Sequence, residues 1–177
     1  MRHDLSARNR RRSAFAAAVA VLVVAGCGDD GDTAASSAPE PFTECELVST
    51  STAKPTATLS IQLSDYAVVS SAPSVAAGAV QFDTKNVGQR PHELVIVKGG
   101  SAASLPKDKD GSMAEEKLAD NALIGEIEEF PTGEDCTGVF DLEPGKYVLL
   151  CNLVEKVNGK TVAHFAQGMF GTLTVTS

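Results

Sequence analysis

The chain has 177 residues, of which 43% are hydrophobic and 5% aromatic, with 15 Lys and Arg against 23 Asp and Glu. The formal net charge of −8 at pH 7 argues against a nucleic-acid partner, because phosphate backbones repel a negative protein surface. Its length allows one folded domain with its own hydrophobic core.

Residues 1–26 have the pattern of a signal peptide. A start rich in arginine precedes an apolar run over 14–25, which is shorter than the roughly 20 residues that a membrane-spanning helix needs. Residues 24–27 (VAGC) resemble a bacterial lipobox, in which the cysteine receives lipid and becomes the mature N-terminus. We therefore expect cleavage before Cys27 and lipidation of that residue. The alternative is an ordinary signal peptide followed by a chance cysteine.

Residues 27–44 are predicted to form a flexible linker, because they are small, acidic and proline-containing and cannot bury a core. Without residues 1–26 the chain keeps 10 basic and 22 acidic residues, a net charge near −12. The expected product is exported and held by its lipid at the outer face of the bacterial cytoplasmic membrane, at the cell surface or in the periplasm. Its folded domain is predicted to cover residues 45–177.

Short strand patterns fill most of this domain. Leu59, Ile61 and Leu63 alternate with polar residues, as in a strand with one buried face, and 94–97 is a continuous run rich in β-branched residues. Further strand patterns cover 80–83, 139–142, 147–150 and 172–176, and turn sequences at 77–78, 86–88, 99–100, 143–145 and 158–159 separate them. The series predicts an all-β antiparallel sandwich or barrel.

One segment has helical features instead. Ser112 and Glu115 have the spacing of a capping box, and residues 115–119 contain good helix formers. We expect a short helix in this connection, with Met113 and Leu118 on its inward face. Met113 is therefore not counted as a metal ligand.

The four cysteines have different expected fates. Cys27 belongs to the lipobox, and Cys151 follows an apolar strand with histidine and methionine downstream. Cys45 and Cys136 remain, and in an oxidising compartment they most simply form a disulfide. The alternative is two unrelated buried thiols.

Four side chains form a candidate metal site: His92, Cys151, His164 and Met169. His92 and His164 are the only histidines after residue 26, and both His92 and Cys151 lie on the core side of predicted strands. Twelve residues separate Cys151 from His164 and four separate His164 from Met169, so one loop can return three donors to one point. Each residue alone is more simply explained as core structure. Together they are the donor set of a blue copper site, and the thioether favours copper over zinc.

Three stretches resemble the cupredoxins, the blue or type 1 copper proteins that include plastocyanin and azurin. They are residues 86–94 (with Asn86-Val87-Gly88 and Pro91-His92-Glu93-Leu94), 145–151 (GKYVLLC) and 164–175 (HFAQGMFGTLTV). The resemblance implies a Greek-key β-sandwich that holds one copper ion, cycling between Cu(I) and Cu(II), through His92, Cys151, His164 and an axial Met169. Asn86 resembles the family's asparagine, which ties the two ligand-bearing loops together and helps to hydrogen-bond around the sulfur.

The loop between Cys151 and His164 is longer than in most cupredoxins. Its charged, turn-like segment 155–160 (EKVNGK) predicts a protruding hairpin beside the metal. This hairpin is expected either to shield His164 or to form a docking surface.

The leading interpretation is a one-electron carrier, not an enzyme, that serves membrane or surface redox proteins and is kept near the membrane by its lipid. The alternative is copper storage or delivery by the same domain. A copper oxidase or nitrite reductase needs further histidine-rich metal centres, and no histidine is left in the domain to build them. A metal-free adhesion domain is a further alternative, against which the ordered four-donor set argues.

Overall fold

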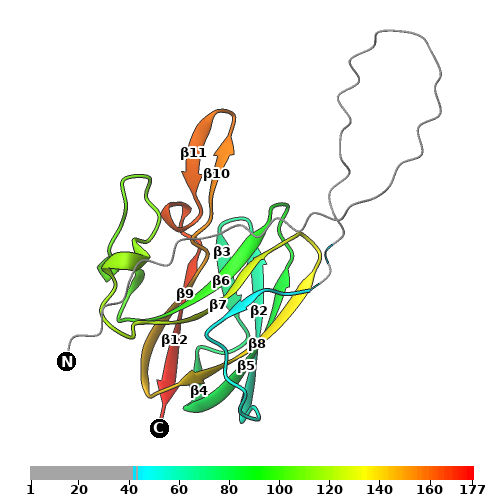
Figure 1. Ribbon diagram of the computed structural model, residues 1–177, viewed down its shortest axis with the longest axis vertical. Coiled ribbons are helices and arrows are strands. Elements are labelled where there is room, and N and C mark those ends of the chain that lie inside the picture. The colour runs from blue at the N-terminus through cyan, green and yellow to red at the C-terminus, as the bar shows by residue number, and fades with distance from the viewer. Residues whose placement is uncertain (1–41, 43) are drawn as a thin grey trace, which may run out of the picture. The chain divides into compact units, whose positions relative to one another are not determined.

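The computed structural model describes residue 42 and residues 44–177, in which two larger β-sheets share a hydrophobic core and a separate two-stranded hairpin protrudes (Figure 1). The predicted signal peptide, the predicted lipidation site Cys27 and most of the predicted linker lie outside the described residues. Among the residues described, no helix combines the length and the apolar character needed to cross a membrane.

The larger sheet contains six strands in the order β1-β7-β6-β9-β12-β4. Neighbouring strands are antiparallel, except that β12 and β4 run parallel. The strands are β1 (Leu47–Val48), β4 (Ser74–Ala76), β6 (His92–Lys98), β7 (Leu123–Phe130), β9 (Gly145–Leu150) and β12 (Phe170–Thr176).

The smaller sheet contains four strands in the order β3-β2-β5-β8, with β2 and β5 parallel. Its strands are β2 (Ala57–Ser64), β3 (Ala67–Ser70), β5 (Gly78–Asn86) and β8 (Asp135–Leu142). The chain crosses between the sheets from β5 to β6, from β7 to β8 and from β8 to β9, so consecutive strands often face each other across the core. The predicted β-sandwich is confirmed.

The main core lies between the sheets and follows from the alternation in the sequence. Leu59, Ile61 and Leu63 of β2 point into it, as predicted, while the residues between them face outward. The rings of Phe82 and Phe140 meet edge to face, with centroids 5.8 Å apart. Such a pair adds about 0.5–1.5 kcal/mol to the hydrophobic gain from its burial.

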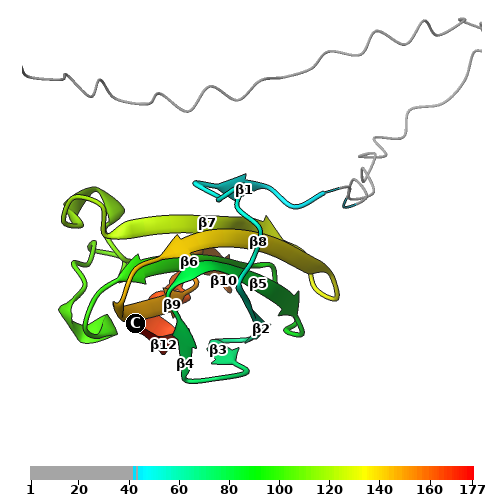
Figure 2. The same ribbon diagram turned by 90° about the horizontal axis from the view of Figure 1, so that it is seen from below.

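A second, smaller core lies on the outer face of β6 and β9. Val95, Val97, Val148 and Leu150 point to this side, where the connection between β6 and β7 covers them. That connection lies beside the sandwich in both views (Figures 1 and 2). Because β6 is buried on both faces, its sequence is a continuous apolar run instead of an alternating one.

The predicted short helix in this connection is a single 3-10 turn, η2 (Glu115–Lys117), and its capping box does not form. Ser112 Oγ donates to Asp110 Oδ1 at 2.6 Å, and Glu115 Oε1 accepts from Asn152 Nδ2 at 3.0 Å. Both side chains therefore have partners that compete with the cap, and the capping-box prediction is wrong. Met113 and Leu118 do pack inward, as predicted.

A disulfide joins Cys45, which precedes β1, to Cys136 on β8, across 91 residues of sequence. These are the two cysteines that the sequence left for a disulfide. It attaches the first described segment to the smaller sheet. Cys151 is the one free cysteine among the described residues, and it is buried.

Replacing both Cys45 and Cys136 with Ser is expected to lower the free energy of unfolding by about 2–5 kcal/mol, because a long loop is no longer closed in the unfolded chain. Denaturant unfolding followed by circular dichroism measures the loss. A reductant should bring the unmodified protein to the stability of the double variant and leave the double variant unchanged. Equal unfolding midpoints for the two proteins under oxidising conditions would contradict the prediction.

Gly125 on β7 lets the ring of Phe140 and the chain at Val48 approach closely. A Cβ at this position would lie 2.6 Å from Phe140 Cε1 and 2.6 Å from the carbonyl oxygen of Val48. Gly125→Ala is therefore expected to cost about 1–3 kcal/mol of stability by overpacking. Gly100→Ala is the control, because nothing lies within 4 Å of its added Cβ. Equal unfolding midpoints for the two variants would contradict this account.

Candidate metal centre

His92 and Cys151 meet because they lie at neighbouring ends of two antiparallel strands. His92 begins β6 and Cys151 directly follows β9, and these strands pair in the register Val95 to Leu150. Both residues alternate with side chains of the main core, as the sequence predicted. Each is 0% exposed.

His164 and Met169 reach the same place through a tight turn. His164 follows β11 and precedes a 3-10 turn, η3 (Phe165–Gln167), and Gly168 reverses the chain with φ 96°. The Met169 N–H donates to the carbonyl of His164 at 3.1 Å, and the Cys151 N–H donates to the carbonyl of Met169 at 3.1 Å. The turn is thus closed on itself and attached to Cys151. The Met169 side chain is 0% exposed and belongs to the same core cluster as Cys151.

The two imidazoles and the thiol converge through specific atoms. Cys151 Sγ lies 3.3 Å from His164 Nδ1 and 3.9 Å from His92 Nδ1. The two Nδ1 atoms are 3.2 Å apart, and the three side chains are fully buried. The structure therefore brings together three of the four side chains proposed as ligands through donor atoms, with the fourth in the adjoining core.

The outer nitrogen of each imidazole faces a carboxylate. His92 Nε2 lies 3.2 Å from Asp65 Oδ1, and His164 Nε2 lies 3.1 Å from Glu155 Oε1. Ionised carboxylates only accept hydrogen bonds, so a hydrogen bond at each contact requires the proton on Nε2, which in a neutral ring leaves a lone pair on Nδ1. Two lone pairs at 3.2 Å repel each other unless a cation lies between them. The donor set and its geometry fit a copper ion.

The surroundings set the protonation of these groups in the absence of a metal ion. Burial, with the nearby charge of Glu93, raises the pKa of the Cys151 thiol to about 12. A metal ion that takes the thiolate therefore displaces a proton. Burial lowers the pKa of His92 in spite of Asp65, which favours the neutral imidazole that binds metals.

Hydrogen bonds from the Gln89 N–H and from His92 keep the pKa of Asp65 below its ordinary value, although burial acts to raise it. The Gln89 N–H lies 2.9 Å from Asp65 Oδ1. Asp65 is therefore ionised at neutral pH and oriented by the same loop that leads to His92.

Asn152, the residue after Cys151, fastens this strand end to the connection between β6 and β7. Its side chain accepts from the Met113 N–H at 2.6 Å and donates to the Met113 carbonyl at 3.0 Å. Its own N–H donates to Glu93 Oε1 at 2.8 Å, and burial raises the pKa of Glu93 to about 8. Sequence reasoning missed this network, because neither spacing nor composition links Asn152 to Met113.

Asn86 is buried and organises the loop before His92. Its Nδ2 donates to the carbonyls of Arg90 at 2.8 Å and Phe130 at 3.1 Å, and its Oδ1 accepts from the Gly88 N–H at 3.0 Å. The resemblance had suggested that Asn86 ties both ligand-bearing loops together and acts around the sulfur. These bonds join the His92 loop to the end of β7, and the role around the sulfur stays a prediction.

Asn86→Ala is expected to cost about 1–3 kcal/mol of stability for each buried backbone group left without a partner, reduced where water replaces the amide. Gln89→Ala, an exposed change in the same loop, is the control and should lie within about 0.5 kcal/mol of the unmodified protein. Thermal and denaturant unfolding measure both. A variant at position 86 as stable as the control would contradict the role assigned to the amide.

The predicted hairpin is present as β10 (Val154–Val157) and β11 (Lys160–Ala163). Asn158 and Gly159 form its turn with φ 49° and φ 76°, the left-handed conformation that these residue types favour. The hairpin protrudes from the sandwich (Figure 1). Its residue Glu155 contacts His164, which is 1% exposed, so the hairpin shields this imidazole.

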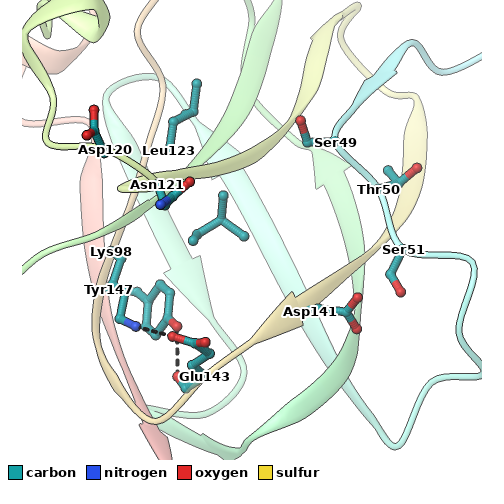
Figure 3. Close-up of a pocket in the computed structure, with 11 residues that line it drawn as sticks. Ser49, Thr50, Ser51, Lys98, Asp120, Asn121, Leu123, Asp141, Glu143 and Tyr147 are labelled. Atoms are coloured by element: carbon teal, nitrogen blue, oxygen red, sulfur yellow. Dashed lines mark hydrogen bonds and ion pairs between the residues drawn. The ribbon is translucent and has the colours of Figure 1, made fainter. Parts of the chain in front are cut away.

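A hollow of about 560 Å³ lies at the opposite ends of β6 and β9, away from the candidate ligands (Figure 3). Lys98 and Glu143 form an ion pair of 2.6 Å in its wall, and the Tyr147 hydroxyl donates to the Glu143 carbonyl at 2.7 Å. A smaller hollow of about 130 Å³, lined by Pro91, Val154 and His164 among others, lies beside the candidate site.

Solved structures with a similar fold include two auracyanins. A structure of auracyanin B is 24% identical, with a TM-score of 0.50, and the match covers 73% of this chain and 95% of that one. Dithionite-reduced auracyanin from Roseiflexus castenholzii is 26% identical, with a TM-score of 0.50, and the match covers 70% of this chain and all of that one. Neither a protein-family model nor a curated protein matches the sequence. The chain has the cupredoxin fold, as its sequence predicted.

Proposed function

We propose that the protein is an extracytoplasmic one-electron carrier with a single blue copper site. The observation that supports this most directly is the convergence of His92 Nδ1, His164 Nδ1 and Cys151 Sγ within 3.9 Å of one another in a fully buried cluster. The cupredoxin fold, which the chain shares with two auracyanins, supports the same assignment. Met169, which is buried in the adjoining core, would contribute its thioether as a fourth donor to the ion.

A bound copper ion would supply one-electron chemistry by alternating between Cu(I) and Cu(II). The residues contribute a fixed geometry. His92 and Cys151 lie at the ends of strands buried on both faces, and hydrogen bonds within the turn fix His164 and Met169. Ligands held in this way move little between the two charge states, which keeps the reorganisation accompanying electron transfer small. Burial also excludes water from the thiol.

A carrier fits better than an oxidase. Within the part of the chain that the structure describes, His92, Cys151 and His164 are the one group of at least three His, Cys, Asp or Glu side chains placed to hold a metal ion. Their burial leaves little room for a substrate to bind the metal. The shielding of His164 by the hairpin also argues against rapid metal exchange, which copper storage or delivery would require.

The location and partners of the protein form part of the same proposal. The Cys45–Cys136 disulfide supports an oxidising compartment. A lipid on Cys27 and a linker over residues 27–44 would keep the domain near the membrane. Membrane or surface redox proteins would then be its electron donor and acceptor.

Adding Cu(II) to the purified protein is expected to produce an intense thiolate-to-copper absorption band and narrow copper hyperfine splitting in electron paramagnetic resonance. Cys151→Ser should remove both, because the thiolate is their source. Met113→Leu is the matched control, since Met113 is buried in the second core and should leave the spectra unchanged. If the unmodified protein stayed colourless with Cu(II), or if the Cys151→Ser protein turned blue, the assignment of a blue copper site at Cys151 would be wrong.

Voltammetry of the copper protein separates the carrier from the storage alternative. A carrier should cycle reversibly and keep its copper when challenged with a chelator in either charge state. Irreversible voltammetry together with rapid loss of copper to the chelator would favour storage or delivery.

A further inference from the structure

We propose that Asp65, Glu155 and Arg90 form a clamp that holds both imidazoles with Nε2 protonated and Nδ1 turned toward the thiol sulfur. These residues are positioning residues, because they act through His92 and His164 and do not reach the metal centre themselves. The inference rests on the proposed copper site and adds what fixes its imidazoles. We refer to the three residues as the carboxylate clamp.

Asp65 lies in the turn between β2 and β3, in the smaller sheet. Its Oδ1 is 3.2 Å from His92 Nε2 and accepts from the Gln89 N–H at 2.9 Å, while its Oδ2 is 3.8 Å from Arg90 Nε. The carboxylate is therefore held from three directions. The first imidazole cannot rotate without losing its bond to this oriented group.

Glu155 comes from β10 of the protruding hairpin and approaches from the other side. Its Oε1 is 3.1 Å from His164 Nε2, and Arg90 Nη1 donates to its two carboxylate oxygens at 2.8 and 2.9 Å. Tyr66 also packs edge to face on the His164 ring, with centroids 5.3 Å apart. The second imidazole is thus fixed by a carboxylate and by a neighbouring ring.

Arg90 joins the two halves of the clamp. Its guanidinium contacts Asp65 and Glu155, and its backbone carbonyl accepts from the buried Asn86 amide at 2.8 Å. The clamp therefore links three separate segments, the β2–β3 turn, the loop before β6 and the hairpin. Because Arg90 is about one-third exposed, we attribute its role to orientation and not to a large energy of ion pairing.

Gly88 provides an independent sign that the Asp65–His92 contact requires space. A Cβ at Gly88 would lie 2.6 Å from Asp65 Oδ1 and 2.7 Å from His92 Nε2. Any larger side chain would therefore press on both atoms of the hydrogen bond. Only glycine leaves this contact undisturbed.

The clamp has a chemical consequence for a bound metal ion. A carboxylate that accepts the outer N–H of an imidazole fixes the tautomer and raises the basicity of the other nitrogen, and loss of such a partner typically weakens metal binding 10- to 100-fold. Two carboxylates and one guanidinium also leave a net negative charge beside the site. Both effects favour the oxidised ion and lower the reduction potential.

Nitrogen-15 NMR of the metal-free protein tests the geometry directly. Two slowly exchanging Nε2–H protons are expected, one on each imidazole. Glu155→Ala should lose only the His164 signal, and Asp65→Ala or Gly88→Ala should lose only the His92 signal. Glu155→Gln should keep both, because its amide oxygen can still accept. Glu143→Gln is the control, since it removes an ion-paired carboxylate at the far end of β6.

Copper binding gives a second readout. Glu155→Ala is expected to weaken copper affinity about 10- to 100-fold. Glu155→Gln should raise the reduction potential, by about 59 mV for each tenfold loss in the ratio of Cu(II) to Cu(I) affinity. Glu143→Gln should change neither quantity.

The outcomes separate the clamp from the proposed function. A blue protein whose Glu155→Ala variant keeps the slow His164 Nε2–H and its full copper affinity would overturn the clamp alone. The unmodified protein could instead stay colourless with copper while the Asp65→Ala and Glu155→Ala variants each lose only the Nε2–H signal of their own imidazole. That result would overturn the copper assignment and support the positioning of the imidazoles.

Discussion

Two imidazole nitrogens 3.2 Å apart, with a buried sulfur beside them, form an arrangement that neutral rings oppose. When Nε2 of each imidazole carries the proton, the lone pairs of the two Nδ1 atoms face one another and repel. A cation bound between them would remove this repulsion. The surrounding structure resists this repulsion in several ways. β6 and β9 place the first imidazole and the thiol at adjoining strand ends, a closed turn fixes the second imidazole, and carboxylates occupy the outer nitrogens.

The two strands that carry His92 and Cys151 are packed on both faces. One face contributes to the core between the sheets, and the other is covered by the connection between β6 and β7, which Asn152 fastens to the strand end. An ordinary two-sheet sandwich would leave this outer face to solvent. This extra layer buries both sides of the strands beside the candidate metal centre, which suits a site whose side chains must keep their places when the charge of a bound ion changes.

Much of the fold and three candidate ligands could be predicted from local patterns. His92 alternates with Leu94 and Ile96 along the strand, which predicted that its side chain faces the core. The sequence Asn158-Gly159 predicted the hairpin turn. Strand β7 was not predicted, because Glu126 interrupts its apolar pattern. The Glu126 side chain is nevertheless buried. The capping box failed because Asp110 and Asn152 bind its two side chains.

The carboxylate clamp could not be predicted from the sequence, because Asp65, Arg90 and Glu155 lie in distant segments that only the tertiary fold brings together. Charged residues of this kind are common on any protein surface. Gly88 is the one residue near them whose type hints at the contact. Its significance could be recognised only from the structure, which places Asp65 and His92 where a side chain at position 88 would lie.

The single buried thiol has a consequence for how the chain matures. A disulfide from Cys151 to either Cys45 or Cys136 would consume the thiol of the candidate metal centre and leave the other cysteine without its partner. Oxidative folding must therefore discriminate among three sulfurs in the described part of the chain. Discrimination follows if the sandwich closes around Cys151 before an oxidant reaches it, because the order of assembly would then keep this thiol reduced.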